Sequence, residues 1–158
     1  MDQFHRTGKV ITIGAIGATL VAMLLMYYAS AKMQELTTLL GLIALLLILT
    51  CGQLYAGSNW ARWIVGAVLV LIGILWSYQT IRSTATPVTA FWTVHFGVAL
   101  FSLVFGIAIL TVRHVKHFLA HQRTNRNPFV RRLLQALWLV AGLAVAIGLV
   151  VDIARLLE

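Results

Sequence analysis

The chain has 158 residues, of which 61% are hydrophobic and 10% are charged, and its mean hydropathy is +0.93. Soluble domains carry about 25% charged residues, and a soluble chain of this length cannot bury so much apolar surface. The composition therefore excludes an ordinary soluble domain and predicts a protein whose main solvent is lipid.

The net charge is +8, from 12 Lys and Arg against 4 Asp and Glu. Such a basic excess is typical of proteins that bind nucleic acid or anionic lipid, and the position of the basic residues distinguishes the two. Cys51 is the single cysteine, so an intrachain disulfide is excluded.

Five apolar stretches each approach the roughly 20 residues that a helix needs to cross a bilayer. None contains Asp, Glu, Lys or Arg, and none shows the period-two alternation of a membrane strand. We predict an all-α integral membrane bundle of five transmembrane helices with short loops, forming one domain over residues 1–158. The predicted spans are residues 10–30, 36–55, 63–81, 90–112 and 133–151.

The first span, residues 10–30, follows Arg6 and Lys9, as the apolar part of a signal peptide would. Its apolar run is longer than the roughly 7–15 residues of such peptides. We therefore expect a retained transmembrane helix.

Residues 58–63, at the start of the third span, read SNWARW. Ser58 or Asn59 can cap a helix. Trp60 and Trp63 share a helix face, and tryptophan prefers the headgroup level of a membrane, while Arg62 adds the positive charge typical of the cytoplasmic side. We interpret Trp60, Arg62 and Trp63 as an interfacial anchor. A binding site for a partner or ligand is the alternative.

The stretch NWARWIVGAVLVLIGIL resembles a helix start that is common in small, uncharacterised bacterial multi-span inner-membrane proteins. The resemblance covers this stretch alone. It implies a multi-pass protein of the bacterial inner (cytoplasmic) membrane, and it carries no active-site residue to transfer.

The external end of the predicted bundle gathers aromatic residues around His95, which is the one ionisable side chain well inside a span. A belt of interfacial aromatic residues explains this pattern, and an external-leaflet pocket for a lipid or small molecule is the alternative. The candidate pocket residues are Tyr27, Tyr28, Trp76, Tyr78, Gln79, Trp92 and His95.

Residues 113–132, RHVKHFLAHQRTNRNPFVRR, form a basic segment without an acidic residue. Val115, Phe118 and Leu119 form a short apolar stripe, so we expect the fourth helix to continue into the interface. Asn127 and Pro128 fit the N-cap and first position of the fifth helix. The predicted contacts with anionic headgroups are Arg113, Lys116, Arg123, Arg126, Arg131 and Arg132.

His114, His117 and His121 are spaced by three and four residues, a pattern that can chelate a metal. No acidic or cysteine ligand accompanies them, so we predict no metal site. Nucleic acid is not expected either, because the segment is short and carries no recognised nucleic-acid-binding motif.

Small residues recur at spacings of four in two spans. The first span contains Gly14, Ala18 and Ala22, and the fifth contains the pairs Gly142 and Ala146, and Ala144 and Gly148. Such faces allow helices to pack closely, either within one bundle or between copies of the chain.

Lys and Arg are concentrated on one side of the five-span topology. That side carries nine of them, Arg6, Lys9, Arg62, Arg113, Lys116, Arg123, Arg126, Arg131 and Arg132. The other side carries three, Lys32, Arg82 and Arg155. The asymmetry predicts an N-terminus inside and a C-terminus outside, with residues 113–132 as a cytoplasmic loop. If the fifth segment were re-entrant, the C-terminus would instead lie inside.

The sequence favours a non-enzymatic membrane protein that self-associates or serves as an accessory subunit, and whose basic loop contacts anionic lipid. A small transporter or channel for a lipid-like or neutral solute is the alternative. An enzyme is disfavoured because the spans lack carboxylates and nucleophile–base pairs, and the loops lack the common catalytic motifs. We predict no cofactor.

Overall fold

The computed structural model describes the backbone of residues 2–30, 37–82, 90–125 and 127–157. At helix ends near the gaps and the termini, including residues 27–30, 37–40, 90–95 and 151–157, it describes the backbone without the side chains. Within these ranges the chain is all-α. The helices are α1 (Asp2–Ser30), α2 (Thr37–Tyr55), α3 (Asn59–Arg82), α4 (Ala90–Thr111), α5 (Arg113–Asn125) and α6 (Pro128–Leu157).

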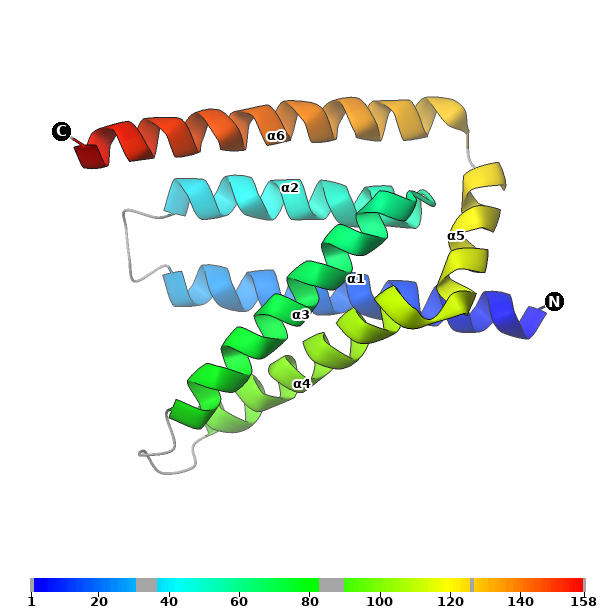
Figure 1. Ribbon diagram of the computed structural model, residues 1–158, viewed down its shortest axis with the longest axis horizontal. Helices are drawn as coiled ribbons and strands as arrows, with labels where there is room; N and C mark the ends of the chain where they lie inside the picture. The colour runs from blue at the N-terminus through cyan, green and yellow to red at the C-terminus, as the bar shows by residue number, and fades with distance from the viewer. Residues whose placement is uncertain (1, 31–36, 83–89, 126, 158) are drawn as a thin grey trace.

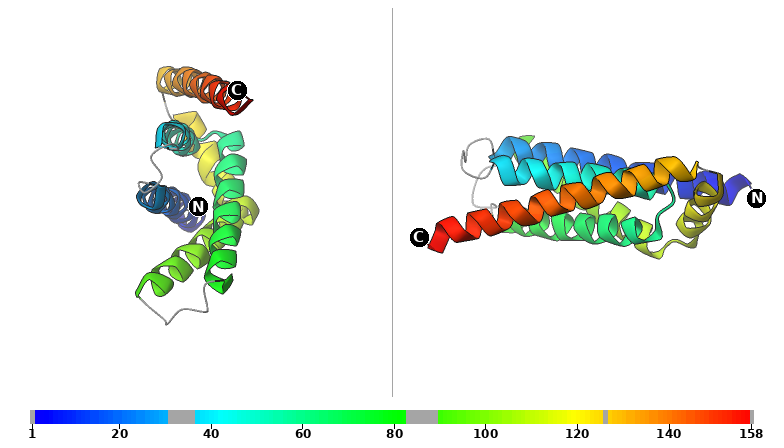
Figure 2. Two further views of the ribbon diagram at one scale, coloured as in Figure 1. Left: turned by 90° about the vertical axis from the view of Figure 1, so that its left-hand side faces the viewer. Right: turned by 90° about the horizontal axis from the view of Figure 1, so that it is seen from above.

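The long helices run between two ends of an elongated bundle (Figure 1). One end holds the start of α1, the α2–α3 turn, the whole of α5 and the start of α6, while the C-terminus lies at the other end. We call the first of these the α5 end. Helices α3 and α4 form the most extensive contact, and α1 and α2 lie beside them. Helix α6 runs along α2 at the edge of the bundle (Figure 2).

Three helices are long and apolar enough to cross a membrane, at His5–Met26, Asn59–Arg82 and Pro128–Val150. A fourth span results if Phe96–Thr111 and Arg113–Asn125 count as one, although a bend of 69° separates them. The described part of the chain therefore contains three to four helices that can span a membrane. The predicted span 36–55 corresponds to α2, whose described apolar part, Gly41–Tyr55, is shorter than a full span.

The bend after α4 follows a change in sequence character. Helix α4 is mostly apolar and contains no Lys, Arg, Asp or Glu, whereas α5 alternates basic residues with Val115, Phe118 and Leu119, all three of which are buried. Charged residues are costly within hydrocarbon, so a chain that turns here keeps them out of it while burying the apolar stripe. The predicted continuation of the fourth helix is thus a separate helix that lies across the α5 end.

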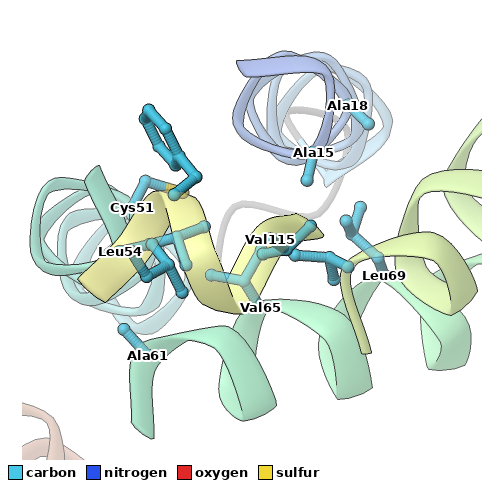
Figure 3. Packing of buried hydrophobic residues seen from close by; sticks show 11 residues of the cluster. Ala15, Ala18, Cys51, Leu54, Ala61, Val65, Leu69 and Val115 are labelled. Atoms are coloured by element: carbon cyan, nitrogen blue, oxygen red, sulfur yellow. The ribbon is translucent and has the colours of Figure 1, made fainter. Parts of the chain in front are cut away.

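The main core lies beneath α5 (Figure 3). Val115 and Phe118 of α5 meet Leu54 of α2, Val65 of α3 and Ala15 of α1, all of them shielded from solvent. A smaller cluster of Ala22, Ile72, Trp76 and Ala99 joins α1, α3 and α4 nearer the other end.

Most of the small residues named above in α1 and α6 face other helices of the same chain, whereas Ala146 is exposed. Ala18 and Ala22 are buried, and a Cβ atom at Gly14 would collide with the ring of Phe105 in α4. In α6, Gly142 and Gly148 face Leu46 and Leu42 of α2. These positions therefore serve packing within the bundle, as one of the two sequence-based interpretations expected.

Candidate functional site

The α2–α3 turn is fixed by backbone hydrogen bonds. Ser58 N–H donates to the Gln53 carbonyl at 3.0 Å, and Gly57 N–H donates to the Leu54 carbonyl at 3.0 Å. These two bonds define a Schellman motif, in which the residue after the helix adopts a left-handed conformation. Gly57 occupies that position with φ of 89°. The Ser58 hydroxyl donates to Gln53 Oε1 at 2.9 Å, so this buried pair ties the turn back to α2.

Helix α5 lies directly against this turn and against α1. A Cβ atom at Gly57 would lie 2.5 Å from the Leu119 carbonyl oxygen and 2.7 Å from the Arg123 backbone nitrogen. A Cβ atom at Gly8 would likewise collide with the His114 carbonyl oxygen and lie 2.8 Å from Phe118 Cβ. Two glycines therefore allow the backbone of α5 to approach α1 and the turn, and this placement leaves its basic side chains facing outward.

Helix α6 begins beside the same turn. The Phe129 N–H donates to the Asn127 side-chain oxygen at 3.0 Å, which confirms the predicted cap before Pro128. Further along α6, Trp138 Nε1–H donates to the Thr50 hydroxyl of α2 at 2.9 Å, and its ring lies edge-on to Trp60 at 4.9 Å between centroids. These contacts hold the first turns of α6 next to the start of α3.

A pocket of about 210 Å³ opens where these three segments meet. Its lining comes from the α2–α3 turn and the start of α3, from the last turn of α5 and from the first turns of α6. The lining residues are Gly57, Ser58, Asn59, Trp60, Arg123, Arg131 and Gln135. Two guanidinium groups from different helices thus share one pocket, and the described residues of its lining include no acidic one.

The predicted anionic-lipid contacts are divided by the fold. Arg123 and Arg131 line the pocket. Arg113, Lys116 and Arg132 are exposed outside it, and Arg126 lies outside the described residues. Sequence reasoning missed Ser58, Asn59 and Gln135 as parts of this site. The spacing of four between Arg131 and Gln135 places them on one helix face and was an available signal.

The three residues of the predicted anchor occupy different environments. Trp63 is 55% exposed, as a side chain at a membrane interface can be, whereas Trp60 packs against Trp138. Arg62 is only 1% exposed, and its Nε and Nη1 atoms have no hydrogen-bond partner among the described residues. Its guanidinium carbon lies 5.1 Å from the centre of the Trp63 ring, within the range of a cation–π contact.

The burial of Arg62 is explained by the face of α3 on which it lies. Gly66 follows one turn later on that face, and a Cβ atom there would lie within 3.1 Å of Ile109 and Leu110 in α4. Arg62 therefore lies on the face of α3 that packs toward α4. Arg62 is thus a buried polar residue, as are Gln53 and Ser58 of the preceding turn.

The histidines of α5 do not gather into a metal site in the described part of the chain, where no group of three metal-binding side chains occurs. His121 instead contacts His5 of α1, with ring centroids 4.8 Å apart, and its Nε2 lies 2.9 Å from the Asn125 side-chain nitrogen. His5 also contacts Phe118, at 5.2 Å between centroids. The contacts of these rings thus help join α5 to α1.

The predicted pocket at the other end of the bundle is described in part. Trp76 is buried in the smaller core cluster, whereas Tyr78 and Gln79 on the same helix are exposed. The side chains of Tyr27, Tyr28, Trp92 and His95 lie outside the described residues. This pocket therefore stays a prediction.

Three threonines nearer the bundle centre are satisfied by their own helices, whereas the buried Ser102 hydroxyl has no hydrogen-bond partner among the described residues. Thr12, Thr19 and Thr50 donate their hydroxyl hydrogen bonds to the carbonyl four residues earlier, at 2.8, 2.8 and 2.7 Å. This is the ordinary arrangement of threonine in apolar helices. The pocket at the α5 end, in contrast, brings two arginine side chains and the side-chain amides of Asn59 and Gln135 together.

Comparison of the chain with protein-family models, with curated proteins and with solved structures finds no match.

Proposed function

We propose that the protein is a multi-pass protein of the bacterial inner membrane that acts as a non-enzymatic accessory or self-associating subunit. In this proposal its α5 end contacts anionic lipid on the cytoplasmic side. One observation carries it: α5 lies across the end of the bundle with its apolar stripe buried in protein and Arg113, Lys116 and Arg123 exposed.

The proposed topology has five spans, with the N-terminus inside and the C-terminus outside. Helix α2 has 19 residues, which span about 28 Å at 1.5 Å per residue, close to the roughly 30 Å of a hydrocarbon core. Helix α4 has 22 residues and spans about 33 Å by the same measure. In Figure 1 successive long helices begin at opposite ends of the bundle, and α6 runs along its length. This arrangement supports five membrane crossings rather than a re-entrant last helix.

The proposed orientation predicts opposite accessibility for two engineered cysteines. In a Cys51→Ala background, a cysteine replacing Gln122 on α5 should react with an impermeant maleimide in inverted inner-membrane vesicles and not in intact cells. A cysteine replacing Ser83, between α3 and α4, should react with an impermeant maleimide in intact cells. Labelling of both positions from one side would contradict the five-span topology.

A lipid role for the exposed charges predicts a position-dependent loss of binding. Each basic residue near an anionic surface contributes about 1 kcal/mol, so replacing Arg113, Lys116 and Arg132 with Gln should weaken phosphatidylglycerol binding by roughly a hundredfold. The matched control replaces Lys32, Arg82 and Arg155 with Gln. It removes the same charge from the opposite side of the proposed topology and should change phosphatidylglycerol binding little. Native mass spectrometry of the purified protein with defined lipids measures both.

Two results of that measurement would contradict the proposal. Equal binding of phosphatidylglycerol and phosphatidylcholine by the unsubstituted protein would exclude the lipid role, as would equal losses in the two triple variants.

The same spectra report the number of subunits. A single copy that carries no co-purified membrane protein would exclude the subunit role. That role is supported by α6, which contacts mainly α2 and exposes Leu139, Leu143 and Ile147 along its other side.

A further inference from the structure

We infer that the pocket at the α5 end is a specific binding site for one phosphomonoester group, carried by a lipid headgroup or by a small soluble molecule. The inference rests on the proposed lipid-contacting role of this end and adds a defined ligand chemistry to it. A diffuse attraction between exposed charges and a membrane needs no pocket, whereas here two arginines from separate helices line a single one.

The two guanidinium groups are available to a ligand. Within the described part of the chain, the side chains of Arg123 and Arg131 form no ion pair and no hydrogen bond. Arginine presents planar pairs of N–H donors that match two oxygens of a phosphate group, and such charge-assisted pairs are about twice as strong as neutral hydrogen bonds. Two arginines on different helices can therefore hold one phosphate group from two directions.

The remaining walls add neutral donors and partial positive charge. Gln135 lies one turn after Arg131 on α6, and its side-chain amide can donate to a third oxygen. Asn59 and Trp60 open α3, and a helix N-terminus carries unsatisfied N–H groups and roughly half a positive charge, which favours anions. The positions of these groups are fixed by the Gly57 turn and by the contact between Trp60 and Trp138.

Charge and size select the ligand class. A phosphomonoester carries close to two negative charges at neutral pH, because its second pKa is about 6, and this balances two guanidinium groups. A phosphodiester or a carboxylate carries one negative charge. The volume of about 210 Å³ is below the roughly 300–1,000 Å³ of pockets that enclose drug-sized ligands. The pocket therefore fits a headgroup-sized anion whose remaining part extends outside.

The test uses a variant that keeps every charge. Replacing Arg123 and Arg131 with Lys leaves the net charge and the diffuse attraction unchanged but removes the paired donors. Binding of phosphatidic acid, a monoester, and of phosphatidylglycerol, a diester, is measured by native mass spectrometry on the full chain. The control variant replaces Arg6 and Arg82, which are exposed and outside the pocket, with Lys.

We expect the unsubstituted protein and the control to prefer phosphatidic acid by roughly tenfold, and the pocket variant to lose most of that preference. A second variant, Gln135→Glu, places a negative charge in the pocket and should also abolish the preference. Gln3→Glu adds the same charge at an exposed position at the same end and should retain it. Far-ultraviolet circular dichroism verifies that each variant is folded.

Competition with glycerol 3-phosphate distinguishes the two sources of the phosphate group. Displacement of phosphatidic acid by millimolar glycerol 3-phosphate assigns the site to soluble phosphomonoesters. Retention of the lipid assigns the site to the headgroup together with its acyl chains. Equal affinity for the two lipids, or a preference that survives in the Lys variant, overturns the inference. Either result leaves the proposed lipid contact intact, because that contact is measured separately by the loss of phosphatidylglycerol binding in the triple Gln variant.

Discussion

Replacing Gly57 with alanine should destabilise the protein and displace α5. The left-handed backbone at φ of 89° costs a residue with a Cβ atom about 1–3 kcal/mol. In addition, the new Cβ atom would lie 2.5 Å from the Leu119 carbonyl oxygen and 2.7 Å from the Arg123 nitrogen. Both are backbone atoms that cannot rotate away, and such overpacking costs roughly another 1–3 kcal/mol.

The free energy of unfolding in mixed micelles measures this effect, with Gly17→Ala as the control. Gly17 lies within α1, and no described atom would come within 4 Å of its added Cβ. Alanine in a helix interior is favoured over glycine by about 0.5–1 kcal/mol, so the control should be slightly stabilised. Equal stability of the two variants would mean that the turn does not hold α5 as the structure describes.

A second large effect is expected from Phe118→Ala, which should detach α5 from the bundle. The ring is fully buried, with its centroid 5.2 Å from that of His5 and 6.5 Å from that of Tyr55. Removing a buried phenylalanine side chain costs about 3–5 kcal/mol. Since α5 has only three buried residues, Val115, Phe118 and Leu119, this loss is a large fraction of its attachment.

Hydrogen–deuterium exchange of peptides covering Arg113–Asn125 should increase in this variant, while exchange in α3 should remain near that of the unsubstituted protein. Phe129→Ala is the matched control, because Phe129 is 68% exposed and its loss should change stability by less than about 0.5 kcal/mol. The preference for phosphatidic acid should disappear together with the protection of α5, since Arg123 would leave the pocket. Unchanged protection of α5 in Phe118→Ala would contradict the described packing.

The sequence by itself predicted a membrane-spanning protein and located its long apolar helices, but it did not predict α5 as a separate helix. Continuous apolar runs without charge are readable because each span must exclude charged residues along its whole length. The limits of α2 and α3 lie near the predicted ones for this reason. The cap at Asn127 and the buried stripe of Val115, Phe118 and Leu119 were also readable, since both depend on residues only a few positions apart.

The tertiary structure alone decided which residues meet. The charge pattern grouped Arg123 and Arg131 with four other basic residues, but only the docking of α5 against Gly57 and of Trp138 against Trp60 placed these two in one pocket. Arg62 appeared to be a surface charge because it stands between two tryptophans, yet packing against α4 covers its face of α3. Local patterns report the environment along one helix. They contain no distances between helices, and a binding pocket is defined by those distances.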